Sequence, residues 1–95
     1  MRVTWAPSAR DDLRGIVLHI AKDNVDAALG MHDRIEAAVR KLDAMPRRAR
    51  LGRLPNTREL VIGRSPYIAV FRVTSDGVEI ARVIHGAQNW PPQES

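Results

Sequence analysis

The spacing of apolar residues changes once along this chain, near Thr57, and that change constrains the fold more than any other feature. Between Leu13 and Leu42 apolar residues recur every three to four positions, which is the period of helices that bury one face. From Thr57 onward they tend to alternate with polar residues, which is typical of strands with one face on a core. The sequence therefore predicts an α+β fold in which the helices precede most of the strands.

A short strand over residues 2–5 and two helices are predicted in the first half of the chain. Ser8 lies at the start of the first helix and forms, with Asp11, a pair that resembles a capping box. Asn24 interrupts the helical pattern and offers an N-cap for a second helix, which Pro46 ends. We expect a helical hairpin with one apolar face per helix.

Three strands are predicted in the second half, over residues 58–62, 67–74 and 78–85. The dipeptide Asp76-Gly77 lies between two apolar runs and predicts a tight hairpin turn. Together these strands are expected to form a three-stranded antiparallel meander.

A two-residue turn would fix the register of the hairpin, with Phe71 opposite Arg82 and Ile68 opposite His85. Alternation then assigns one set of side chains to the face expected to pack under the helices: Tyr67, Ala69, Phe71, Val73, Ile80 and Ile84. The other face is expected to stay more open: Ile68, Val70, Arg72, Ala81, Val83 and His85. That open face would bring Arg72 and His85 together.

The composition indicates one soluble globular domain that spans residues 1–95. The chain has no cysteine, which excludes a disulfide framework and a zinc site built on thiolates. Its apolar runs are too short to span a membrane, and its first residues lack the apolar stretch of a signal peptide. The three histidines have no metal-ligand spacing. We therefore expect a cytoplasmic protein without membrane contacts, metal or cofactors.

Positive charge is concentrated in residues 40–64, which contain eight basic and two acidic residues. The whole chain has a net charge of +4 and a pI of about 10.6, so its excess charge is one local patch. Such a patch attracts polyanions by counterion release, and it attracts an acidic protein equally well. The candidate contacts to a nucleic-acid-associated target are six arginines: Arg47, Arg48, Arg50, Arg53, Arg58 and Arg64.

Four segments, in their order and spacing, resemble the RelE/ParE superfamily of bacterial toxins. They are residues 5–13, 57–62, 66–73 and 83–91, of which the last, VIHGAQNWP, is the most distinctive. The resemblance covers essentially the whole chain, although no single motif is diagnostic. It implies the toxin of a type II toxin–antitoxin pair, with an N-terminal strand, a helical hairpin and an antiparallel meander.

The resemblance implies one of two activities. RelE-like members cut mRNA in the ribosomal A site, whereas ParE-like members inhibit DNA gyrase and are not nucleases. This chain departs from the RelE-like pattern, because Glu59 and Val61 stand where that branch has lysines and Ile68 stands where it has an arginine. The chain also has a single tyrosine, Tyr67, and none near its C-terminus. These departures favour the ParE-like branch.

A RelE-like ribosome-dependent endoribonuclease is the alternative. RNA cleavage through attack of the 2′-OH needs a base, an acid and cations that stabilise the developing charge. The candidates are Glu59 as base, His85 as acid, and Arg72 or Arg82 as cation. His85 does not separate the branches, because members of both have a histidine there, and it fits equally well a structural hydrogen bond at the end of a strand.

Both activities imply an acidic cognate antitoxin that covers the toxin, and the complex reaches operator DNA only through that antitoxin. The sheet face expected to be open is more apolar than a free surface requires. Contacts to the antitoxin are therefore predicted at Ile68, Val70, Ala81, Val83 and Trp90. For Trp90 the alternative, which we slightly favour, is packing against the domain itself. A function of another class also fits the charge, namely a small basic nucleic-acid-binding module without toxicity.

Overall fold

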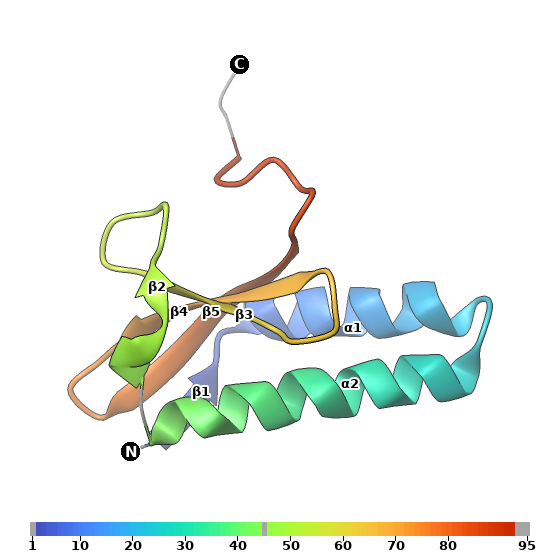
Figure 1. Cartoon of the computed structure of the whole chain (residues 1–95), viewed down its shortest axis with the longest axis horizontal. Helices are drawn as coiled ribbons and strands as arrows, with labels where there is room; N and C mark the ends of the chain where they lie inside the picture. Colours follow the sequence, from blue (N-terminus) through green and yellow to red (C-terminus); the bar gives the residue numbers. More distant parts are fainter. Residues whose placement is uncertain (1, 45, 93–95) are drawn as a thin grey trace.

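The computed structural model describes residues 2–44 and 46–92. Two helices lie side by side as a hairpin next to a sheet (Figure 1). In chain order the elements are β1 (Arg2–Trp5), α1 (Pro7–Ala21), α2 (Val25–Arg40), the 3₁₀ segments η1 (Lys41–Asp43) and η2 (Pro46–Arg48), β2 (Arg50–Leu51), β3 (Arg58–Val61), β4 (Tyr67–Val73) and β5 (Gly77–His85).

The strands form one mixed sheet in the order β1-β5-β4-β3-β2. Strands β3, β4 and β5 form the antiparallel meander that the sequence predicts. Two pairings go beyond the prediction, because β1 joins β5 in parallel and β2 adds a short antiparallel strand to β3. The helices pack on one face of this sheet (Figure 1), so the predicted α+β fold is confirmed.

The two helices begin differently. The side chain of Asn24 accepts a hydrogen bond from the Ala27 amide at 2.9 Å and caps α2, as predicted. Helix α1 begins at Pro7 after an N-cap, Ala6, that makes no side-chain hydrogen bond, so the predicted capping box is absent. Ser8 lies inside the first turn, where its hydroxyl instead donates to the Ala81 carbonyl oxygen at 2.9 Å. None of the helices within residues 2–44 and 46–92 is long and apolar enough to cross a membrane.

The turn of the β4–β5 hairpin lies one residue earlier in the chain than predicted. Thr74 and Gly77 form the closing pair, in which the Thr74 amide donates to the Gly77 carbonyl oxygen at 2.7 Å. The two turn residues are therefore Ser75 and Asp76, and the register next to the turn moves by two residues from the predicted one.

Gly77 is needed for the approach of β1 to β5. Its φ of 154° is a value that residues with a side chain rarely adopt. A Cβ atom at this position would overlap the backbone carbonyl oxygen of Arg2. The glycine that the sequence marks as a turn residue thus permits a parallel pairing between strands from opposite ends of the chain.

A register shift between Val70 and Phe71 interrupts the hairpin. Beyond it the pairing differs from the prediction by one residue, which is enough to move a side chain to the other face. Val83 therefore packs in the core under the helices, and Ile84 lies on the opposite face, which reverses the prediction.

Arg72 and His85 do not lie together, and that prediction is wrong. Arg72 pairs with Glu79 near the turn, whereas His85 pairs with Tyr67 at the other end of the hairpin. At the rise of an extended strand, positions 67 and 72 of β4 are about 17 Å apart. His85 also follows the alternation of the helix-side core, because the register shift changes the face of the end of β5.

Candidate functional site: the arginine loop and its clamp

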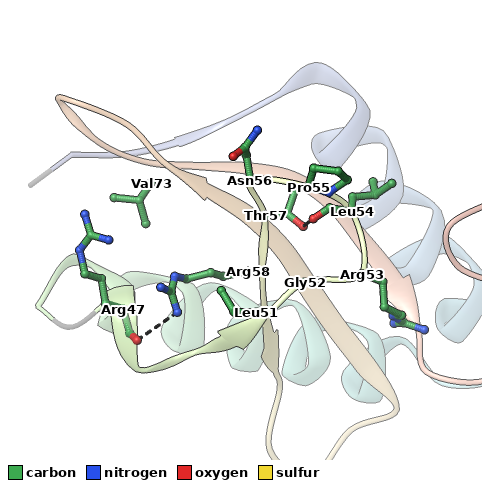
Figure 2. A pocket seen from close by; sticks show the side chains of 10 residues that line it. All are labelled: Arg47, Leu51, Gly52, Arg53, Leu54, Pro55, Asn56, Thr57, Arg58 and Val73. Carbon is green, nitrogen blue, oxygen red and sulfur yellow. Dashed lines mark hydrogen bonds between the residues drawn. The ribbon is translucent and has the colours of Figure 1, made fainter.

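The loop between α2 and β3 contains most of the local positive charge. We call residues 46–58, which include η2 and β2, the arginine loop. An open groove with a volume of about 610 Å³ lies along it, lined by Arg47, Leu51, Gly52, Arg53, Leu54, Pro55, Asn56, Thr57, Arg58 and Val73. Figure 2 shows Arg47 and Arg58 at one end of this groove and Arg53 pointing away from them.

The buried carboxylate of Glu59 clamps this loop to β3. Only 1% of the Glu59 side chain is exposed. Arg53 donates to the carboxylate from its backbone N, Nε and Nη2 at 3.0, 3.2 and 3.1 Å, and Arg50 donates from Nη2 at 3.0 Å. Arg53 also binds the C-terminal tail, where its Nη1 donates to the Trp90 carbonyl oxygen at 3.2 Å. Two of the predicted target-binding arginines are therefore neutralised by Glu59.

Two opposing effects act on the pKa of Glu59. Burial alone would raise this pKa, but the hydrogen bonds from Arg53 and Arg50 and the positive charge of Arg53 outweigh burial and lower it. Glu59 is thus held as an anion that already accepts four hydrogen bonds, which fits a structural role better than that of a general base.

Stability is expected to fall in acid because of Glu59. A carboxylate with a lowered pKa stabilises the folded state at neutral pH, and this contribution is lost as the pH falls below about 4.3, the value at which an unfolded glutamate titrates. The free energy of unfolding, measured with urea between pH 7 and pH 3, should decline more steeply in the native chain than in Glu59→Gln. If the free energy of unfolding fell equally with pH in both proteins, Glu59 would not stabilise the fold in the way proposed.

The remaining four arginines of the patch lie in different surroundings. Arg47 and Arg48 are exposed, and neither makes an ion pair among residues 2–44 and 46–92. Arg58 shapes the loop, because its Nη1 donates to the carbonyl oxygens of Arg47 and Ala49 at 3.2 and 2.9 Å. Arg64 lies apart in the β3–β4 turn, where its carbonyl oxygen accepts from Arg34 of α2 at 3.0 Å. Arg47 and Arg58 therefore line the groove together, whereas Arg48, the neighbour of Arg47 in the chain, borders a separate hollow beside Lys41 and Leu60.

Arg82 is engaged with α1. Its Nε and Nη2 donate to the two carboxylate oxygens of Asp12 at 2.7 and 3.2 Å, and this hydrogen-bonded pair raises the pKa of Arg82. Asp12 also accepts from the Val83 amide at 2.9 Å. On its other side, the Arg82 guanidinium lies 5.4 Å from the centre of the Trp90 ring. Arg82 thus connects the sheet, α1 and the C-terminal tail.

The sheet face opposite the helices is not open, contrary to the prediction. Trp90 and Leu54 pack over a cluster made by Ile68, Val70 and Ile84. All five residues predicted to contact an antitoxin are buried to at least 92%: Ile68, Val70, Ala81, Val83 and Trp90. The tail and the arginine loop cover this face, because the apolar strand residues gain more from Trp90 than from water.

The two remaining catalytic candidates lie near the surface in separate places. Arg72 is half exposed and makes a long ion pair with Glu79, at 3.4 Å. His85 packs edge-on against the Tyr67 ring with 5.6 Å between ring centres, and its Nδ1 accepts from the Ala87 amide at 3.0 Å. The bond to Ala87 matches the structural hydrogen bond considered for a histidine at the end of a strand.

Asp12 is the important residue whose role the sequence did not indicate. The helical pattern marks it as an acidic residue near the start of α1, and nothing in the pattern links it to Arg82, 70 positions away. Exposed apolar side chains were also missed, because they fall on positions that periodicity does not single out: Leu18, Val25, Leu29, Leu51 and Val61. Within residues 2–44 and 46–92 there is no cluster of three histidine, cysteine or acidic residues suited to a metal ion.

The sequence matches a known protein family over almost its full length. Residues 3–90 match the family described as ParE toxin of type II toxin-antitoxin system, parDE. The chain is also 42% identical over 90 residues to Y4kP of Sinorhizobium fredii (strain NBRC 101917 / NGR234), a protein with a toxin designation. That match covers 95% of this chain and 93% of the relative.

Two solved structures are similar to this fold. One, from a chromosomal ParDE toxin–antitoxin system of P. aeruginosa, has a TM-score of 0.83 at 27% identity and covers 90% of this chain and 95% of its own. The other, from the RelBE2 toxin–antitoxin complex of Mycobacterium tuberculosis, has a TM-score of 0.54 at 25% identity and covers 87% and 94%. Sequence and fold therefore agree that this chain belongs to the ParE toxin family of type II toxin–antitoxin systems, within the RelE/ParE superfamily.

Proposed function

We propose that this chain is a cytoplasmic growth inhibitor that acts on DNA gyrase, does not cleave mRNA, and is neutralised by an acidic cognate antitoxin. The match to the ParE toxin family over residues 3–90 is the observation that supports this proposal most strongly. In this proposal the docking surface for the target is formed by the exposed Arg47 and Arg48, together with the partly exposed Arg58 that shapes their loop. Positive charge at this place accelerates and orients association with an acidic surface.

The state of the nuclease candidates supports the gyrase-directed activity. Glu59 is buried and binds two arginines, and Arg82 is paired with Asp12, so neither is free to serve a substrate. Arg72 and His85 belong to different ends of the β4–β5 hairpin. Acid–base catalysis requires its groups within hydrogen-bond reach of one reacting centre, and this arrangement does not supply them.

An antitoxin partner fits the charge of the chain and its relatives. The two solved structures come from systems named for a toxin and an antitoxin, ParDE and RelBE2. A toxin with a net charge of +4 and a pI of about 10.6 favours an acidic partner. In the proposed complex the antitoxin alone contacts operator DNA.

Expression in growing cells tests the target. We expect induction of the native chain to trigger the SOS response and gyrase-linked DNA breaks, while primer extension on abundant mRNAs finds no new cuts. His85→Ala should inhibit growth as strongly as the native chain, because His85 has no catalytic task in a gyrase-directed toxin. Co-expression of the neighbouring antitoxin gene should restore growth.

Other results would point to the alternative functions. Cuts within translated frames that disappear in His85→Ala would identify a ribosome-dependent endoribonuclease. Normal growth despite soluble expression would support a basic nucleic-acid-binding module without toxicity.

A further inference from the structure

One row of paired side chains crosses the sheet under the helices and continues beyond their cover. Phe71 pairs with Ile80 on β5 and with Arg58 on β3. Arg58 pairs in turn with Leu51 on β2. Side chains of directly paired residues lie on the same face of a sheet. Phe71 and Ile80 are fully buried in the core, whereas Leu51 is 76% exposed. The apolar row of the core thus ends in an uncovered leucine.

The uncovered end of this row lies in the groove along the arginine loop (Figure 2). Four aliphatic side chains line this groove: Leu51, Leu54, Pro55 and Val73. The guanidinium groups of Arg47 and Arg58 line one end of it, while Arg53 points away from them and is bound by Glu59. None of the residues that line the groove is acidic. The groove therefore joins aliphatic surface to positive charge that its own wall does not neutralise.

Arg58 is held in place in the groove. Its Nη1 donates to the carbonyl oxygens of Arg47 and Ala49 at 3.2 and 2.9 Å, which fixes the guanidinium against the loop. These two bonds leave the N–H donors of Nε and Nη2 for a ligand. Arg47 is exposed and makes no ion pair among residues 2–44 and 46–92, so its guanidinium can turn to the same ligand. One carboxylate can therefore bind both arginines while only Arg47 has to be ordered.

We propose that this groove binds a segment of gyrase in which a carboxylate lies next to an aliphatic side chain. The carboxylate binds Arg47 and Arg58, and the aliphatic side chain covers Leu51 as the helices cover Phe71. This inference rests on the proposed gyrase target and adds the chemistry of the segment that is recognised. A nucleic acid fits the groove less well, because no aromatic side chain lines it for a base to stack on, and a sugar–phosphate chain has no aliphatic side chain to cover Leu51.

The affinity of the full chain for purified gyrase tests the apolar contact. Leu51→Ser should weaken binding about tenfold, because the complex loses the burial of one leucine side chain. This factor should stay the same between about 0.05 and about 0.3 M salt, since apolar burial is not screened, whereas the loss caused by Arg47→Gln should shrink. Leu29→Ser is the matched control, because Leu29 is 56% exposed on α2 and lies outside the groove. It should bind gyrase within about twofold of the native chain.

A titration of the ¹⁵N-labelled full chain, followed by NMR, tests the chemistry of the segment without gyrase. The probe is the acetylated dipeptide amide glutamyl-leucine, which should shift the Gly52 amide and the Asn56 side-chain amide with a dissociation constant in the millimolar range. Glutamyl-glycine and glutaminyl-leucine, each lacking one of the two groups, should bind more weakly. Equal or tighter binding of the dinucleotide thymidylyl-thymidine would overturn the choice of a protein segment.

The outcomes separate this inference from the proposed function. If the native chain inhibits gyrase and Leu51→Ser binds it as tightly as Leu29→Ser does, the groove inference alone is rejected. If Leu51→Ser weakens binding of the antitoxin but not of gyrase, the groove belongs to the antitoxin and the choice of gyrase is overturned. A native chain that does not bind gyrase rejects the proposed function, and the inference with it.

Discussion

Arg47→Glu combined with Arg48→Glu is expected to abolish growth inhibition. Both side chains are exposed, and neither makes an ion pair within residues 2–44 and 46–92, so the reversal leaves the folded chain intact. At an acidic target, each reversal replaces an attraction with a repulsion. A total of about 3 kcal/mol corresponds to roughly 100-fold weaker binding. Growth after induction and the dissociation constant for immobilised gyrase would measure the effect.

A second double variant controls for charge. Arg14→Glu with Arg64→Glu changes the net charge by the same amount at two exposed sites outside the arginine loop. It should retain toxicity and bind gyrase within about threefold of the native chain, because the long-range attraction alone is screened by salt. If both double variants lost activity equally, net charge rather than the arginine loop would determine target binding.

Gly77→Ala is expected to have the largest effect on stability of any single methyl addition in the chain. The new Cβ would overlap the backbone of Arg2, and the φ of 154° is unfavourable for alanine. To remove this overlap, β1 has to move away from β5, and that movement breaks their parallel pairing. We expect the free energy of unfolding to fall by about 3 kcal/mol, which lowers the Tm of a chain of this size by roughly 10–20 °C.

Gly63→Ala is the matched control for this substitution. Apart from Gly63 itself and its two chain neighbours, no atom lies within 4 Å of a Cβ built at this position, so the added methyl group meets open space. Its Tm, measured by thermal denaturation followed by circular dichroism, should stay within about 3 °C of the native value or rise slightly. A Gly77→Ala protein as stable as Gly63→Ala would show that β1 is not held at this point.

The order of the helices and strands could be predicted because each depends on local patterning. Asn24 caps α2 through its own side chain, and the alternation of β4 is visible without reference to the rest of the chain. The parallel pairing of β1 with β5 could not be read in the same way, since it joins residues about 75 positions apart. Sequence patterns mark which residues prefer a strand, but not which strand lies beside it.

The register of the β4–β5 hairpin shows why small errors matter in a sheet. Asp76-Gly77 is a strong hairpin signal, yet the pair that closes this turn is Thr74 and Gly77. The register shift at Val70 then changed the face of Val83 and separated Arg72 from His85. An irregularity of this kind has no signature in the alternation of apolar residues.

The candidate site was predicted in part. The arginines of the loop were identified from local charge, and Arg47 and Arg58 do lie at one end of a groove in the structure (Figure 2). The sequence could not reveal that Glu59 neutralises Arg50 and Arg53, or that Asp12 binds Arg82, because these partners meet only in the folded chain. The sequence also could not show that Val70 is buried, because Trp90, which packs against the same cluster, comes from the distant C-terminal tail.

Supercoiling of plasmid DNA by purified gyrase is the most direct test of the proposed function. Increasing amounts of the native chain should stop supercoiling and trap cleaved DNA, and the Arg47→Glu/Arg48→Glu variant should need about 100 times more protein for the same effect. Full gyrase activity at a large excess of the native chain, together with mRNA cleavage on purified ribosomes, would contradict the account.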